Sequence, residues 1–128
     1  ARIASALSQG MAPLAAASVA RWFTPDFAAR APDPVAVIEA GLLATSPQGY
    51  AGCCAAIRDM DLRQLGGLIT TPTLVISGAA DPATPPEHAA ALVKAIPEAQ
   101  LKVLDGAHLS NVEQPDLFAG AVLSFLAA

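Results

Sequence analysis

The stretch from Pro72 to Pro115 constrains the fold of this chain more than any other part of the sequence. An apolar run at residues 73–76 is followed by Asp81, and a second apolar run at residues 101–104 is followed by His108. A helical pattern separates the two runs, as it does in a parallel strand–helix–strand unit. Functional groups of α/β proteins gather at the carboxyl ends of parallel strands. We therefore expect the acid and the histidine to lie close together.

The sequence before this stretch has a different character. Residues 1–62 contain no strand candidate, and short helices begin there where a capping side chain meets a proline, at Thr24-Pro25, Asp33-Pro34 and Ser46-Pro47. After a connector at 62–69, the chain reads strand, helix, strand, helix, with the second strand at 100–104. We predict an α/β chain: a helical domain over residues 1–62, followed by a parallel βαβα part over residues 63–128.

The predicted sheet is incomplete. The strand runs do not alternate between apolar and polar residues, which is typical of strands buried on both faces of a parallel sheet. Two such strands leave two bare edges. Charged residues make up only 14% of the chain, against about 25% in a typical soluble domain. We expect the chain to associate with further polypeptide or with a second copy of itself.

Composition also excludes several classes of function. The net charge of −4 and the absence of a Lys/Arg cluster argue against nucleic acid. No apolar run approaches the roughly 18 residues of a membrane span, and the first residues do not resemble a secretion signal. Cys53 and Cys54 are adjacent, which suits reduced thiols in a cytoplasmic protein. Neither they nor the two histidines match zinc spacing, so we expect no metal and no cofactor.

Asp81 and His108 are the candidate catalytic residues. Either one alone could be an ordinary loop residue. The run Thr84-Pro85-Pro86-Glu87 reads as a helix-capping box, which leaves Asp81 available for another role. An ionised acid that binds one imidazole nitrogen fixes the tautomer, so that the other nitrogen can take a proton from a nucleophile. His88 is expected to lie on the surface of the following helix.

These motifs resemble the C-terminal part of an α/β-hydrolase. A G-x-x-D pattern ends at Asp81, and an H-x-x-x-x-E-x-P pattern runs from His108 through Glu113 to Pro115. The order nucleophile, acid, histidine is that of the family's catalytic triad. The resemblance implies that Asp81 is the triad acid and His108 the triad histidine. It also implies that residues 1–62 form the helical cap that such enzymes insert before the acid.

Within this superfamily the chain most resembles the 3-oxoadipate enol-lactonases of the β-ketoadipate pathway of aromatic catabolism. Three stretches carry this closer resemblance: RWFT at 21–24, GYAGCCAAIRD at 49–59 and HLSNVE at 108–113. The resemblance implies a small lactone or ester substrate with a free carboxylate. Arg21 and Arg58 are the candidate cations for that carboxylate, and Trp22 is a candidate apolar wall for the ring.

One member of the triad has no counterpart. None of the seven serines of the chain lies in the G-x-S-x-G pattern that carries the family's nucleophile. We expect that the chain is the C-terminal half of a hydrolase and that it is inactive by itself. Two alternatives stay open. The parent could be another α/β-hydrolase, such as a carboxylesterase, a C–C hydrolase or a haloperoxidase-like enzyme. The chain could also be a non-catalytic module that oligomerises through its strand edges.

Overall fold

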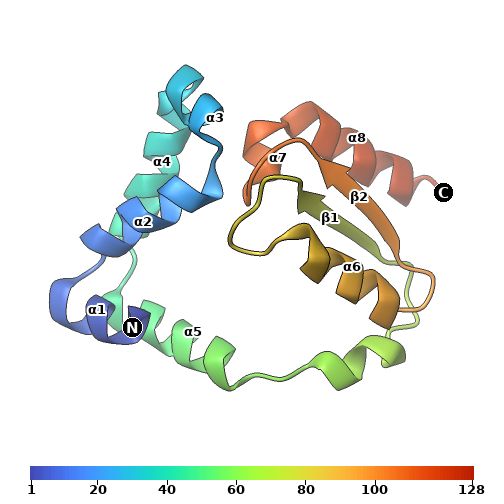
Figure 1. The fold of residues 1–128 in the computed structure, drawn as a ribbon, viewed down its shortest axis with the longest axis horizontal. Helices are drawn as coiled ribbons and strands as arrows, with labels where there is room; N and C mark the ends of the chain where they lie inside the picture. Colours follow the sequence, from blue (N-terminus) through green and yellow to red (C-terminus); the bar gives the residue numbers. More distant parts are fainter. The chain divides into compact units, whose positions relative to one another are not determined.

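The computed structural model describes all of residues 1–128, and only helices precede the first strand, after which strands and helices alternate. The elements are α1 (Arg2–Gln9), α2 (Ala12–Trp22), α3 (Pro25–Arg30), α4 (Pro32–Leu43), α5 (Pro47–Asp59), the 3₁₀ helix η1 (Arg63–Leu68), β1 (Leu74–Gly78), α6 (Pro86–Ala95), β2 (Gln100–Leu104), α7 (Ser110–Glu113) and α8 (Pro115–Leu126). Figure 1 shows these elements along the chain. No helix combines the length and the apolar character that crossing a membrane requires.

The chain divides into two compact units. A helical unit comprises Ala1–Ala20 and Pro25–Asp61, and an α/β unit comprises Leu62–Ala128 together with the four residues Arg21–Thr24. This short segment consists of the last two residues of α2 and the two residues that follow them, and it groups with the α/β unit. The helical domain and the βαβα part expected from the sequence differ from these units chiefly by that segment.

The helical unit is built on small side chains. Helices α1 and α5 pack against each other, and the buried apolar residues of this unit are Ala6, Met11, Ala15, Phe27 and Ala51. Helix α5 begins as expected, because Ser46 Oγ accepts a hydrogen bond of 3.3 Å from the Gly49 N–H. Helix α4 does not. It begins at Pro32 and has no side-chain cap, so the expected start at Asp33-Pro34 is wrong by two residues.

The α/β unit contains the predicted parallel pair of strands. Strands β1 and β2 pair in register from Leu74 opposite Gln100 to Gly78 opposite Leu104. The second strand occupies the expected residues, whereas the first begins one residue later than its apolar run and continues into Gly78. Helix α6 packs against both strands and α8 packs against β2, and the two helices lie on either side of the strand pair in Figure 1. The predicted parallel strand–helix–strand–helix arrangement is confirmed.

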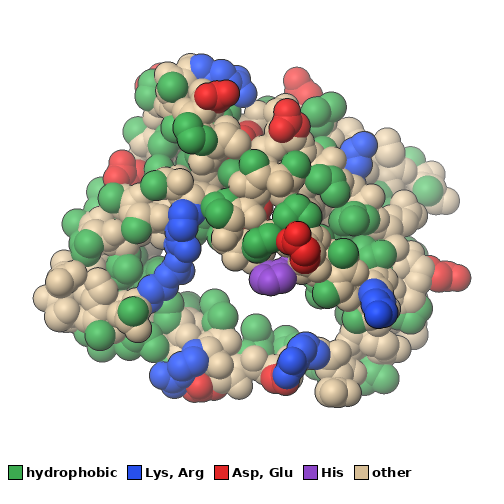
Figure 2. Space-filling view, viewed as in Figure 1, with side chains coloured by type: hydrophobic (Ala, Val, Ile, Leu, Met, Phe, Trp, Pro, Cys, Tyr) green, Lys and Arg blue, Asp and Glu red, His purple; other side chains and the backbone are tan.

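Two details of the sequence-based prediction for this unit are wrong. Strand β2 is not buried on both faces, since Leu101 and Val103 are 43% and 45% exposed. The packing of α6 and α8 leaves these two side chains partly open to solvent. Figure 2 shows hydrophobic side chains interspersed with charged ones over the face in view. Thr84 does not cap α6, which begins at Pro86 without a side-chain cap. The Thr84 hydroxyl binds Asp81 instead.

The carboxyl ends of the two strands come unusually close together. The Ala79 N–H donates to the Leu104 carbonyl at 2.8 Å, and the Ala80 N–H donates to the Gly106 carbonyl at 2.9 Å. A Cβ atom at Gly78 would overlap the carbonyl oxygen of Ala107 and lie 2.6 Å from that of Gly106. Only glycine allows this approach. It brings the loop that follows β1 against the loop that follows β2.

Candidate active site

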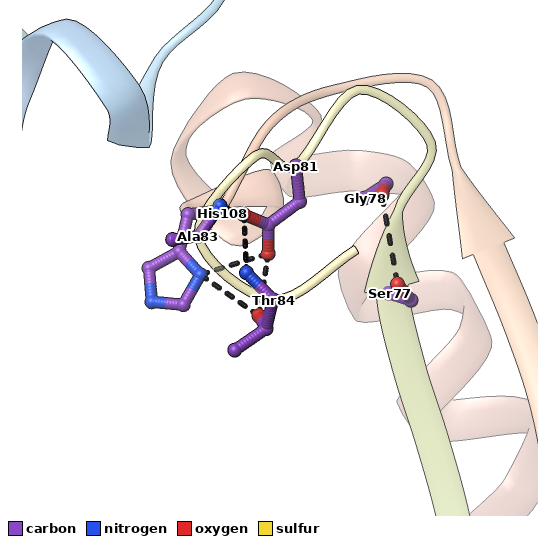
Figure 3. A network of polar contacts seen from close by, with 6 residues as sticks. All are labelled: Ser77, Gly78, Asp81, Ala83, Thr84 and His108. Atoms are coloured by element: carbon purple, nitrogen blue, oxygen red, sulfur yellow. Dashed lines mark hydrogen bonds and ion pairs between the residues drawn. The ribbon is translucent and has the colours of Figure 1, made fainter. Parts of the chain in front are cut away.

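Asp81 and His108 meet where these two loops touch. Asp81 follows β1 and His108 follows β2, and 2.8 Å separates Asp81 Oδ2 from His108 Nδ1. The acid is 6% exposed, whereas the histidine is only half-buried. Figure 3 shows the imidazole ring with Nδ1 toward Asp81 and its other nitrogen pointing away. The expectation that strand order brings this pair together is met by the geometry.

Both oxygens of the Asp81 carboxylate accept two hydrogen bonds each. Oδ1 accepts hydrogen bonds from the N–H groups of Ala83 at 2.7 Å and Thr84 at 3.0 Å, and Oδ2 accepts the Thr84 hydroxyl at 2.7 Å in addition to His108. Burial raises the pKa of Asp81, but hydrogen bonds from Thr84, His108 and Ala83 favour the ionised form more strongly. The pKa of Asp81 therefore lies below its usual value.

Thr84 is a member of the site that the sequence did not reveal. Its hydroxyl donates to Asp81 Oδ2, and the hydroxyl oxygen Oγ1 lies 3.2 Å from His108 Nδ1. Because an ionised carboxylate only accepts hydrogen bonds, Nδ1 must carry the proton, and the Thr84 oxygen can accept a share of that N–H. The signal that could have found this role is the spacing of the hydroxyl, three residues after the acid in a proline-rich loop.

Trp22 lies against the histidine. Its ring is stacked on the His108 imidazole, with ring centroids 5.9 Å apart and an angle of 29° between the planes. Next to this contact, the Leu109 N–H donates to the Trp22 carbonyl at 3.0 Å. The structure thus places one of the three residues suggested for substrate binding beside the acid–histidine pair.

Glu113, at the end of the short helix α7, binds the segment Arg21–Thr24, which contains Trp22. Its side chain is buried, and its carboxylate accepts the Thr24 N–H at 2.6 Å and the Thr24 hydroxyl at 3.1 Å. A Cβ atom at Gly106 would come within 3.1 Å of Glu113 Oε2, so the loop before His108 is packed closely against this carboxylate. The H-x-x-x-x-E motif had pointed to Glu113, but it did not reveal the partner.

The remaining candidates occupy less informative positions. Arg21 belongs to the α/β unit with Trp22. Arg58 lies in the helical unit, where it forms an exposed ion pair of 2.7 Å with Asp59, so its expected role stays a prediction. His88 is exposed, as expected, and lines a hollow of about 250 Å³ that also contains the acid–histidine pair. No group of three or more His, Cys, Asp or Glu side chains is placed to hold a metal ion.

This arrangement is suited to proton transfer. A buried, ionised acid fixes both the tautomer and the orientation of a half-exposed imidazole, whose second nitrogen is left for a reacting group. An acid–histidine pair held on loops after parallel strands, with a helix between the strands, is the arrangement that an α/β-hydrolase uses for two members of its triad.

Comparison with known proteins identifies the same class. Residues 49–124 match the family described as TAP-like protein. Over 114 residues the chain is 41% identical to 3-oxoadipate enol-lactonase 2 from Acinetobacter baylyi, which covers 89% of this chain and 43% of that protein. The enol-lactonase from Burkholderia xenovorans is similar in structure, with a TM-score of 0.96 and 40% identity over 99% of this chain and 49% of that one. A hydrolase from Pseudomonas aeruginosa gives a TM-score of 0.93 and 45% identity over 99% of this chain and 48% of its own.

The chain therefore belongs to the α/β-hydrolase superfamily, through the family that its residues 49–124 match. The resemblance to enol-lactonases inferred from its motifs is confirmed by these similarities. The chain spans less than half the length of the relatives that it matches.

Proposed function

We propose that this chain supplies the acid and the histidine of a Ser-His-Asp hydrolase that opens an enol-lactone of the 3-oxoadipate type. The observation that carries the proposal is the 2.8 Å contact between Asp81 Oδ2 and His108 Nδ1, made by a carboxylate whose oxygens are all occupied. The high similarity to two enol-lactonases supports the substrate class.

In this proposal the nucleophile is a serine from outside these 128 residues. His108 takes the proton of that serine through its second nitrogen as the serine oxygen attacks the lactone carbonyl. The ring C–O bond then breaks, and the enolate, which stays attached through the acyl group, is protonated with the proton that His108 took from the serine. Water activated by the same histidine then hydrolyses the acyl-enzyme, which releases the 3-oxo acid and restores the serine. Asp81 stays ionised throughout and stabilises the imidazolium.

Substrate binding is proposed for the residues that the resemblance suggested. Trp22 is already beside the imidazole and offers an apolar wall to the ring of the lactone. A free carboxylate on the substrate calls for a cation, and Arg21 and Arg58 are the candidates. Residues 1–62 would act as the cap over this site.

The partner of the chain is proposed to be the rest of the hydrolase fold. Strand β1 pairs only with β2, so one edge of β1 has no neighbour within this chain. A further parallel strand on that edge would complete the sheet and bring a nucleophile to the same carboxyl end. We expect the chain alone to be inactive. Both cysteines are free, which supports the proposed cytoplasmic location.

A hybrid enzyme tests the proposal. The part of the Burkholderia xenovorans enol-lactonase that this chain does not overlay would be joined to Ala1, and hydrolysis of 3-oxoadipate enol-lactone would be measured. We expect the hybrid to be active. Asp81→Asn should lower kcat by about 10⁴-fold. His108→Ala should lower it by about 10⁶-fold, because it removes the general base itself.

Asp105→Asn is the matched control, since this aspartate is exposed and follows β2 without contacting the pair. Its hybrid should keep full activity. Hydrolysis that persists in the His108→Ala hybrid would show that the pair is not catalytic. A panel that adds a simple aryl ester and a C–C hydrolase substrate decides the substrate class. A higher kcat/KM for either of these than for the lactone would contradict the proposed lactone substrate.

A further inference from the structure

The segment Arg21–Thr24 is fastened to the loop of His108 at successive points. The Trp22 ring stacks on the imidazole, and the Trp22 carbonyl accepts the Leu109 N–H at 3.0 Å. Two residues further on, the N–H and the hydroxyl of Thr24 both donate to the carboxylate of Glu113. The segment therefore contacts the histidine loop at both ends of α7, with Trp22 at Leu109 and Thr24 at Glu113.

Glu113 and His108 belong to one stiff piece of backbone. The N–H groups of Val112 and Glu113 both donate to the Leu109 carbonyl, at 2.8 and 3.1 Å, which closes the turn between the histidine and the glutamate. Glu113 therefore keeps Thr24, its hydrogen-bond partner, at a fixed place relative to the imidazole. Trp22 lies only two residues before Thr24, so its position is restricted as well.

The burial of Glu113 is unusual for an acid without a catalytic assignment. Carboxylates are rarely buried to 6% exposure unless they are firmly hydrogen-bonded. Charge-assisted hydrogen bonds such as those from Thr24 are also the strong ones. The hydrogen bonds from Thr24 therefore offset the cost of burying the Glu113 carboxylate.

We propose that Glu113 is a positioning residue that holds Trp22 in its stack against His108. The inference rests on the proposed function for its catalytic consequence, because the stack limits how far the imidazole can turn away from Asp81. Its structural content is independent of any activity. The two hydrogen bonds to Thr24 fix the backbone of the segment, and the indole then covers one face of the imidazole.

The chain offers a direct readout because Trp22 is its single tryptophan. The imidazole covers one face of the indole in this stack, so the accessibility of Trp22 to a soluble quencher such as acrylamide reports on the contact. In wild-type protein we expect acrylamide to quench the Trp22 emission less than it quenches a free tryptophan, and we expect stronger quenching in His108→Ala, which removes the ring.

Glu113→Ala should make Trp22 more accessible to acrylamide. Glu113→Gln should leave Trp22 nearly as protected as in wild type, because the amide can still accept the Thr24 N–H and can donate to the Thr24 hydroxyl. Glu87→Ala, which removes an exposed glutamate in the first turn of α6, is the control and should match wild type. Circular dichroism confirms that each variant keeps its helices.

Wild-type acrylamide quenching in a folded Glu113→Ala variant would overturn the proposal, as would a wild-type protein whose Trp22 is fully accessible to acrylamide. If Glu113→Ala does not fold, Thr24→Val decides, because it removes one of the two hydrogen bonds. Increased acrylamide quenching in that variant supports the proposal, and unchanged quenching overturns it. In the hybrid enzyme, Glu113→Ala should lower kcat more than it changes KM. If the fluorescence effects appear while no hybrid is active, the positioning role stands and the proposed function fails.

Discussion

Replacing Thr84 by valine should destabilise the α/β unit and raise the pKa of Asp81. The variant deletes the hydroxyl that donates to Asp81 Oδ2 at 2.7 Å, and a methyl group cannot approach the carboxylate so closely. A hydrogen bond to a charged group contributes about 1.5 to 3 kcal/mol. Thr84 is exposed, so water can replace part of the interaction, and we expect a loss near the lower limit, about 1.5 kcal/mol. For a domain of this size that corresponds to a fall of roughly 6 to 12 °C in Tm.

The loss should depend on pH in a defined direction. The folded pKa of Asp81 is lower than that of an ordinary aspartate, because its hydrogen bonds favour the ionised form over the effect of burial. The stability from this group is therefore complete above the unfolded pKa of about 3.9, and it disappears as the pH falls through the lower folded pKa. The difference between wild type and Thr84→Val should be constant near neutral pH and should shrink in acid.

Urea unfolding followed by Trp22 fluorescence measures this difference, because Trp22 belongs to the α/β unit. Carbon NMR of the Asp81 carboxyl group measures the pKa directly. Thr84→Ser keeps the hydroxyl and should behave like wild type. Equal stability of Thr84→Val and Thr84→Ser at neutral pH, or a difference that persists unchanged in acid, would show that the Thr84 hydroxyl does not stabilise ionised Asp81.

Two backbone positions and one helix cap give further tests by thermal unfolding. Gly78→Ala should destabilise by about 3 kcal/mol, because its new methyl group would overlap the Ala107 carbonyl oxygen, which cannot move without disturbing the histidine loop. Gly120→Ala meets nothing within 4 Å in α8 and should stabilise by about 0.5 to 1 kcal/mol, so a loss there would contradict the assignment of free space. Ser46→Ala should cost about 1 kcal/mol and speed hydrogen exchange of the Gly49 amide at the start of α5, whereas an unchanged exchange rate would mean that the cap is not formed.

The sequence was sufficient where the relevant interactions are local or periodic. The second strand was predicted over the residues that form it because its apolar run is short and its boundaries are clear. Ser46 was predicted as a cap and is one, since the bond to Gly49 spans three residues. The meeting of Asp81 and His108 followed from strand order alone.

The sequence was not sufficient where a side chain has a choice of hydrogen-bond partners or a partner far away in the sequence. Thr84 has the spacing of a helix cap, but Asp81 lies three residues before it and binds its hydroxyl more favourably than α6 does. The partner of Glu113 is 89 residues away in the sequence, and no local pattern records a contact at that distance. Strand β2 looked buried because its residues suit a sheet with neighbours that this chain does not contain.

The distribution of the site over the chain limits what any partner has to contribute. Asp81, Thr84, His108, Trp22 and Glu113 all belong to one compact unit. The hydrogen bonds of these residues described above are made within that unit. Both oxygens of the Asp81 carboxylate accept hydrogen bonds, and the imidazole binds through Nδ1 and stacks on Trp22 with one face. If the proposed function is correct, the remaining polypeptide does not need to organise the acid or the histidine. It needs to bring a nucleophile and donors for the oxyanion to the free nitrogen of His108, and a further strand parallel to β1 would end at the same carboxyl edge that the loops of Asp81 and His108 follow.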